Sequence, residues 1–393
     1  MRKINLDYGA AAPLDPAVVQ AMLPYMTEYY GNPSSGHSLG AKPRQALKEA
    51  REKVARLIAA PPERVLFTSS ASEANNLAIK GVVAAYKKKG NHIIASPIEH
   101  YSVLNPLKSL QKAGFEITFL PVDSFGLVDA AQLAEAITDK TVLVSIAVAN
   151  PEIGTVQDVT GLSQVAKEKG VLFHTDATAA VGWMDLDVKK LGVDLLTLAG
   201  DQFYGPKGTG ALYVRKGVRL LPLVEGGIQE LGLRAGTENV AAFVGMGVAA
   251  HMAFQDRQER VKRVSQLRDQ LKEGLFAEVP HLHVNGHEEK RLPHNLHVAV
   301  EFVEGEALFM HLDMAGIYVS SGSSCASQAL KSSQVLAAIG APPELAQGSL
   351  LFTLGKDTKE EDISYVTGEL SRIAALLRQM SPLYSKYLKE GRV

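Results

Sequence analysis

The sequence predicts an α/β fold, in which a mostly parallel sheet with helices on both faces is followed by a smaller α+β domain. Short apolar runs rich in β-branched residues alternate with helical patterns between residues 65 and 214. This alternation is typical of parallel strands joined by crossover helices. A highly charged helical segment at 255–278 then interrupts the pattern, which indicates that the large domain ends nearby.

Each expected strand is an apolar run bounded by turn residues. These runs lie at residues 65–68, 92–95, 117–120, 142–148, 171–174, 195–198 and 211–214. Apolar residues at helical spacing lie between them, at 74–88, 102–113, 130–137 and 162–169.

The C-terminal part mixes strands and helices in a different order. Strands are expected within 283–301, at 319–321 and at 350–354, and residues 360–380 are expected to form a closing helix. We therefore predict a large α/β domain at 16–254 and a small α+β domain made of 1–15 and 255–393.

Composition and charge exclude several classes of protein. The 393 residues are 46% hydrophobic and 21% charged, which excludes intrinsic disorder. The chain has 41 Lys and Arg residues against 42 Asp and Glu, so we expect neither nucleic acid nor a membrane surface as a partner. The most apolar stretch, 240–254, is shorter than the ~18 residues that a membrane span needs.

Cys325 is the only cysteine of the sequence, which excludes an internal disulfide. A lone thiol favours a reducing compartment, and the N-terminal residues lack the apolar core of a signal peptide. We therefore expect a cytoplasmic protein.

In a parallel α/β sheet, ligands bind outside the carboxyl ends of the strands. Ala71 and Ser72 follow the strand at 65–68 and open a helix. Backbone N–H groups and the Ser72 hydroxyl would favour a phosphate there, or the serines of this loop simply cap the helix.

Three further residues lie where chemistry is expected. His100 follows the strand at 92–95, where it either stacks on a ligand and moves a proton or is an ordinary hydrogen-bonded loop residue. Asp176 follows the strand at 171–174, where it either pairs with a cationic ring nitrogen or caps a helix. Cys325 lies in a Ser- and Gly-rich segment, a setting that favours a reactive thiol over a structural one.

Taken together, these segments and several others resemble the NifS/IscS-type cysteine desulfurases, which are class V aminotransferase-like, fold type I pyridoxal-phosphate enzymes. The resemblance covers essentially the whole chain. It is carried by Asn32-Pro33-Ser34-Ser35 with His37, the run 73–81, Glu99-His100, Glu152-Ile153-Gly154-Thr155, Gly205-Pro206-Lys207-Gly208, the run 234–239 and Ser321-Gly322-Ser323-Ser324-Cys325. In this family a lysine binds pyridoxal phosphate as a Schiff base, and a loop cysteine takes sulfur from substrate cysteine, leaving a persulfide and alanine.

The resemblance implies roles for particular residues. Ser72 matches the residue that binds the cofactor phosphate, and His100 matches the histidine that stacks on the ring. Asp176 matches the aspartate that holds the pyridinium nitrogen. Thr237 matches the threonine that reaches the partner subunit's phosphate, which implies a homodimer. Cys325 matches the persulfide cysteine.

The departures from the family pattern fall at positions that bind the cofactor or the substrate in the family. Gln202 stands at the position of the Schiff-base lysine, and an amide nitrogen forms no imine. Asp201 replaces a phosphate-contacting histidine and brings negative charge near the phosphate. At the remaining departures, the family's serine, glutamine, asparagine and arginine are replaced, in that order, by Ala199, Ala179, Pro151 and Leu351. Lys207 lies in a separate turn and is not expected to replace the lysine.

We therefore predict a homologue that serves sulfur transfer or iron–sulfur cluster assembly without full pyridoxal-phosphate-dependent activity. Cys325 would deliver sulfur to an acceptor protein or ligate a cluster shared with an iron–sulfur scaffold. The expected catalytic residues are Cys325 and His100, and Cys325 is the expected metal ligand. The expected cofactor-binding residues are Ala71, Ser72, His100, Asp176, Gln202 and Thr237. One alternative is an active desulfurase, converting L-cysteine to L-alanine and a persulfide, with non-covalently held cofactor. The other is a non-enzymatic dimeric docking scaffold.

Overall fold

The computed structural model describes residues 2–320 and 333–391. Within these residues the large sheet has seven strands in the order β2-β8-β7-β6-β5-β3-β4. Only β8 runs antiparallel to its neighbours, so the predicted mostly parallel sheet is confirmed. The strands are β2 (Val65–Thr68), β3 (His92–Ala95), β4 (Glu116–Phe119), β5 (Thr141–Ser145), β6 (Leu172–Asp176), β7 (Leu195–Ala199) and β8 (Gly210–Val214).

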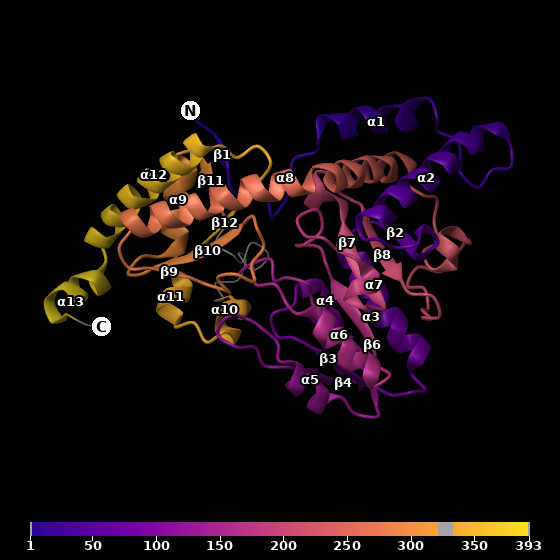
Figure 1. Cartoon of the computed structure of the whole chain (residues 1–393), viewed down its shortest axis with the longest axis horizontal. Helices are drawn as coiled ribbons and strands as arrows, with labels where there is room; N and C mark the ends of the chain where they lie inside the picture. The colour runs from indigo at the N-terminus through magenta and orange to yellow at the C-terminus, as the bar shows by residue number, and fades with distance from the viewer. Residues whose placement is uncertain (1, 321–332, 392–393) are drawn as a thin grey trace.

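Helices cover both faces of this sheet (Figure 1). Because both faces of the sheet are covered, the inner strands β5 and β7 are buried along their whole length. The helices and short 3-10 turns of this part are α1 (Pro16–Thr27), α2 (Ser38–Leu57), η1 (Pro62–Arg64), α3 (Ala71–Tyr86), α4 (Tyr101–Lys112), α5 (Ala130–Ala136), α6 (Val159–Glu168), α7 (Val188–Leu191), η2 (Gly200–Phe203) and η3 (Gln229–Gly232).

A single long helix, α8 (Val240–Glu278), runs from the large sheet into the C-terminal part of the molecule (Figure 1). The charged segment predicted at 255–278 is therefore the second half of a helix whose first half is the apolar stretch at 240–254. Its apolar first half packs on α1 and α2, and its second half packs on α12 (Glu360–Gln379). The predicted domain boundary at residue 254 falls inside this continuous helix, so the division into domains stays a prediction.

The C-terminal part has its own apolar core, separate from the core of the large sheet. Ile4 and Leu6 of the N-terminal segment belong to this second core, because β1 pairs in parallel with β11. The elements of this part are β1 (Ile4–Asn5), β9 (Leu282–Val284), β10 (Asn295–Val300), α9 (Gly305–Met314), β11 (Ile317–Tyr318), α10 (Gln334–Ala338), α11 (Pro343–Gln347), β12 (Ser349–Thr353), α12 and α13 (Pro382–Glu390).

Among the described helices, none is both long enough and apolar enough to cross a membrane.

Candidate functional site

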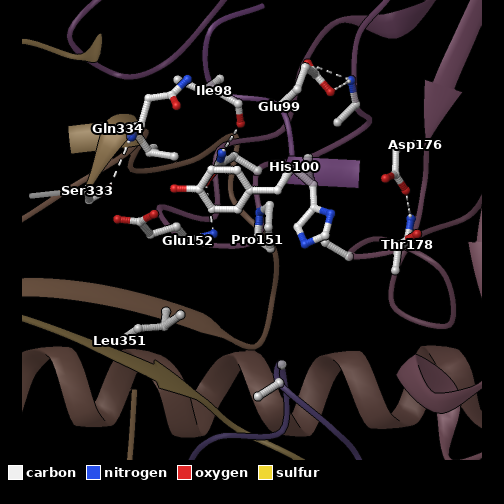
Figure 2. Close-up of a pocket in the computed structure, with 18 of the residues that line it drawn as sticks. Ile98, Glu99, His100, Pro151, Glu152, Asp176, Thr178, Ser333, Gln334 and Leu351 are labelled. Carbon is white, nitrogen blue, oxygen red and sulfur yellow. Dashed lines mark hydrogen bonds between the residues drawn. The ribbon is translucent and has the colours of Figure 1, made fainter. Parts of the chain in front are cut away.

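A cavity of about 300 Å³ lies where the carboxyl ends of the large sheet face the C-terminal part of the molecule. Four of the predicted site residues line it: Ala71, His100, Asp176 and Gln202. They follow different strands, so the sheet brings them together at one edge. Figure 2 shows His100 between Asp176 on one side and Glu152 on the other, with Leu351 of β12 among the lining residues.

Asp176 ends β6 and is held at both carboxylate oxygens. The Asn75 amide nitrogen donates to Oδ2 at 2.7 Å. The Thr178 backbone N–H donates to Oδ1 at 2.9 Å (Figure 2). Asn75 lies in α3 and is fully buried. The carboxylate is thus fixed in one orientation at the wall of the cavity, with lone pairs left over for a donor on a ligand.

His100 is the N-cap residue of α4. Its Nδ1 accepts a hydrogen bond from the Ser102 backbone N–H at 3.1 Å and lies 2.7 Å from the Ser102 hydroxyl. The ring itself is exposed to the cavity. The capping contact therefore fixes the position of the imidazole while leaving one of its edges open to an occupant.

Gln202 lies in η2, directly after β7. Its amide nitrogen donates to the carbonyl oxygen of Gly9 at 3.3 Å. The neighbouring Asp201 carboxyl is largely enclosed, and this burial raises its pKa above the usual value. Lys207 is exposed and is not among the residues that line the cavity.

The cavity is rich in carboxyl groups. Asp7, Glu99, Glu152 and Asp176 line it, and the described lining residues include neither lysine nor arginine. Burial raises the pKa of Glu99 to about 8, the pKa of Glu152 to about 7 and the pKa of Asp7 to about 6. Near pH 7 the Glu99 carboxyl therefore mainly holds its proton and Glu152 titrates, whereas Asp7 is mainly ionised.

Glu99 and Glu152 were not predicted as site residues. Each follows a strand of the large sheet, which is the signal that could have found them. Glu152 Oε1 has no hydrogen-bond partner in the described part of the chain and lies 4.0 Å from His297 Nε2, which is also unpartnered there. His297 lies in β10, far from Glu152 in the sequence, so no local sequence pattern indicates that these two side chains lie close together.

The donor set of the cavity does not fit a pyridoxal phosphate held through a Schiff base. Asp176 and His100 suit an aromatic ring with a protonated nitrogen. An imine requires a primary amine, however, and the lining residues in the described chain carry none. Gln202 offers only an amide that is already bonded to Gly9. We therefore derive no chemical step through this cofactor.

The remaining predicted site residues lie elsewhere. Ser72 is exposed in the first turn of α3, whose N-cap is Ser70, and Ser72 does not line the cavity. Thr237 is exposed in the segment before α8 and does not line it either. Cys325 lies at 321–332, outside the described residues. Within the described ranges, no group of three or more His, Cys, Asp or Glu side chains could hold a metal ion.

Comparisons with known proteins show the family of the chain. The model of the aminotransferase class-V family matches residues 4–366. A cysteine desulfurase IscS of Dictyoglomus turgidum is 47% identical over 381 residues, which is 97% of each chain. Cysteine desulfurase IscS 1 of Archaeoglobus fulgidus is 47% identical over 380 residues, which is 97% of this chain and 99% of the relative.

Solved structures give the same result. A NifS-like protein has a TM-score of 0.90 and 35% sequence identity, covering 96% of this chain and 100% of its own. The apo structure of a cysteine desulfurase from Thermococcus onnurineus has a TM-score of 0.85 at 25% identity, covering 95% of both chains. The chain therefore belongs to the class-V aminotransferase family, among its IscS/NifS-type cysteine desulfurases.

Proposed function

We propose that this protein moves sulfur for iron–sulfur cluster assembly through Cys325, without full pyridoxal-phosphate-dependent desulfurase turnover. The observation that carries the proposal is the absence of any lysine among the described residues that line the cavity. Relatives of the chain are named cysteine desulfurase IscS, which supports a role in sulfur mobilisation. A reducing compartment such as the cytoplasm suits a chain with one cysteine.

The sulfur step needs no cofactor when the donor is itself a persulfide. The Cys325 thiolate attacks the terminal sulfur of the donor, so that one S–S bond forms as another breaks. The donor leaves as a thiolate, and Cys325 becomes a persulfide without net oxidation or reduction. The Cys325 thiolate is also the group that would complete a cluster on a scaffold protein.

The proposed assembly is a homodimer that docks an iron–sulfur scaffold or another sulfur acceptor. Thr237 is exposed in the single chain, which leaves it free to contact a second subunit. Ala71, Ser72, His100 and Asp176 remain the proposed contacts for any pyridoxal phosphate that binds without a covalent link.

The test exploits the fact that Cys325 is the only cysteine. The protein is treated with a small-molecule persulfide donor, and the mass of the intact chain is measured before and after incubation with an iron–sulfur scaffold protein. We expect wild-type protein to gain sulfur and pass it on. The Cys325→Ser variant should gain none, whereas Ser327→Ala, a control in the same segment, should behave as wild type.

Two outcomes would overturn the proposal. If Cys325→Ser supports cluster assembly as well as wild type, the thiol is a remnant and the protein acts as a docking scaffold. If purified protein converts L-cysteine to alanine at the rate of a lysine-containing desulfurase, it is an active desulfurase with non-covalent cofactor.

A further inference from the structure

A row of polar side chains lies behind the imidazole of His100 and connects it to Asp176. The Asn75 amide nitrogen lies 2.7 Å from Asp176 Oδ2 and 2.8 Å from the Ser102 hydroxyl. That hydroxyl lies 2.7 Å from His100 Nδ1. The row joins the end of β6 to the start of α4 through buried side chains of α3 and α4.

The direction of each hydrogen bond follows from what each group can donate. A carboxylate only accepts, so Asn75 must turn its amide nitrogen, and not its oxygen, toward Asp176. Asn75 Oδ1 is thereby left buried without a partner in the described chain. The reverse orientation of the amide would cost more, because Oδ1 would then face an oxygen of the Asp176 carboxylate with no hydrogen between them. The second amide hydrogen points to the Ser102 hydroxyl oxygen, whose own hydrogen is then free to donate to His100 Nδ1.

A second donor reaches the same ring nitrogen. The backbone N–H of Ser102 donates to His100 Nδ1 at 3.1 Å, and a backbone N–H never accepts. Nδ1 therefore carries no proton in the neutral ring, and the proton lies on Nε2. No described residue is a hydrogen-bond partner of Nε2, and the ring lines the cavity.

We infer that Ser102 and Asn75 are positioning residues that hold His100 as its Nε2–H tautomer, so that the imidazole faces the cavity as a hydrogen-bond donor. An occupant must then present an acceptor to His100, such as a carboxylate, phenolate or thiolate. The described lining residues include neither lysine nor arginine, so the His100 Nε2–H is a donor that an anionic group of the occupant can use there. The inference does not depend on sulfur transfer.

Long-range ¹H–¹⁵N spectra of the full chain, labelled at histidine and free of cofactor and sulfur donor, test the tautomer directly. The His100 signals are assigned by their loss in His100→Gln. In wild type we expect Nδ1 to resonate as an unprotonated, pyridine-like nitrogen and Nε2 as a protonated, pyrrole-like one.

Ser102→Ala removes the hydroxyl but keeps the backbone donor. The ratio of Nε2–H to Nδ1–H tautomer should fall roughly 5-fold, as the loss of one net hydrogen bond requires. Ser102→Thr should restore it. Ser109→Ala, which removes an exposed hydroxyl from the same helix, should leave the His100 signals in place.

Unmoved signals from the other histidines show that each variant keeps its fold. A protonated Nδ1 in wild type, or identical His100 signals in Ser102→Ala and wild type, would overturn the inference. Neither result bears on whether Cys325 carries sulfur, which is measured in a separate experiment.

Discussion

The Gln202 amide nitrogen donates a hydrogen bond of 3.3 Å to the carbonyl oxygen of Gly9. Gly9 in turn donates its backbone N–H to the Thr353 hydroxyl at 2.8 Å, which connects the contact to β12. Gln202 stands where the family has its Schiff-base lysine. Its side chain therefore links the large sheet to the N-terminal segment and the C-terminal part. Its amide is occupied in a structural contact, and it offers no amine to a carbonyl ligand.

The first prediction is that pyridoxal phosphate forms no covalent link with this chain. Borohydride reduces an imine to a stable amine, so a Schiff base would be fixed to a lysine and detected by mass spectrometry of peptides. We expect no phosphopyridoxyl group on any peptide, and we expect added cofactor to be removed by dialysis. A reduced cofactor found on a lysine peptide would refute this, and Lys207→Ala would show whether that lysine is the one in the Gly205-Pro206-Lys207-Gly208 turn.

The second prediction is that Gln202→Lys alone restores little activity. The substitution supplies an amine but leaves Leu351 and Ala179 without groups that could hold a substrate carboxylate or a ring oxygen. A lost hydrogen bond to a charged group costs ~1.5–3 kcal/mol, so two such losses in the transition state slow turnover by roughly two to four orders of magnitude. Alanine formation from L-cysteine measures the rate. Turnover equal to that of a lysine-containing relative would show that the other positions do not matter.

The sequence predicted the strands best where local pattern and burial agree. The strands at 65–68 and 92–95 match β2 and β3 to the residue, because each is an apolar run with turn residues at both ends. The sequence did not indicate that the apolar segment at 240–254 and the charged segment at 255–278 form one continuous helix, because the sharp change of composition between them resembles a domain boundary. The apolar part of the helix is buried against α1 and α2, helices that the sequence analysis did not predict.

Some site residues could likewise be placed from the sequence, whereas the contacts between them could not. Asp176 ends β6 and His100 lies in the loop after β3, so the topology of a parallel sheet was enough to place them at one edge. Their connection through Asn75 and Ser102 depends on α3 and α4 packing side by side, which no local pattern specifies. The proximity of the Glu152 carboxyl to the His297 imidazole likewise arises only from the tertiary fold.

The third prediction concerns Glu99, whose carboxyl accepts hydrogen bonds from the Ser96 hydroxyl and the Ala147 backbone N–H. Burial is the main cause that raises its pKa from 4.5 to about 8, and the nearby Asp176 charge adds to it. Between these values the folded protein holds a proton that the unfolded chain releases. The free energy of unfolding therefore falls as pH rises from about 5 to about 8, by at most ~1.4 kcal/mol per pH unit for one group.

Glu99→Gln keeps one acceptor oxygen and removes the titration. Urea unfolding of both proteins across this pH range should show the variant gaining stability relative to wild type as pH rises, with the gain levelling off above about pH 8. Glu152 and Asp7 titrate in both proteins, so their effects cancel in the difference. A difference in stability that does not change with pH would contradict the buried, protonated state of Glu99.

The fourth prediction concerns His294, which stacks on Trp183 with ring centroids 4.2 Å apart. The imidazole is fully enclosed, and burial first, then the charges of Arg260 and Arg268, lowers its pKa from 6.5 to about 3. As pH falls below about 6.5, the unfolded chain takes up a proton at this position and the folded protein does not. His294 therefore costs stability in acid, and this cost grows until the pH approaches about 3.

His294→Phe preserves a flat ring against Trp183 and removes the titration. Because His294 Nδ1 has no hydrogen-bond partner in the described chain, the substitution leaves no donor unpaired on that side. Trp183 is the only tryptophan of the sequence, so its fluorescence reports unfolding at this contact. The variant should become more stable than wild type as pH falls from about 6 to about 4, by up to ~1.4 kcal/mol per pH unit. Parallel stability curves for the two proteins would mean that the ring beside Trp183 takes up a proton in the folded protein as readily as in the unfolded chain.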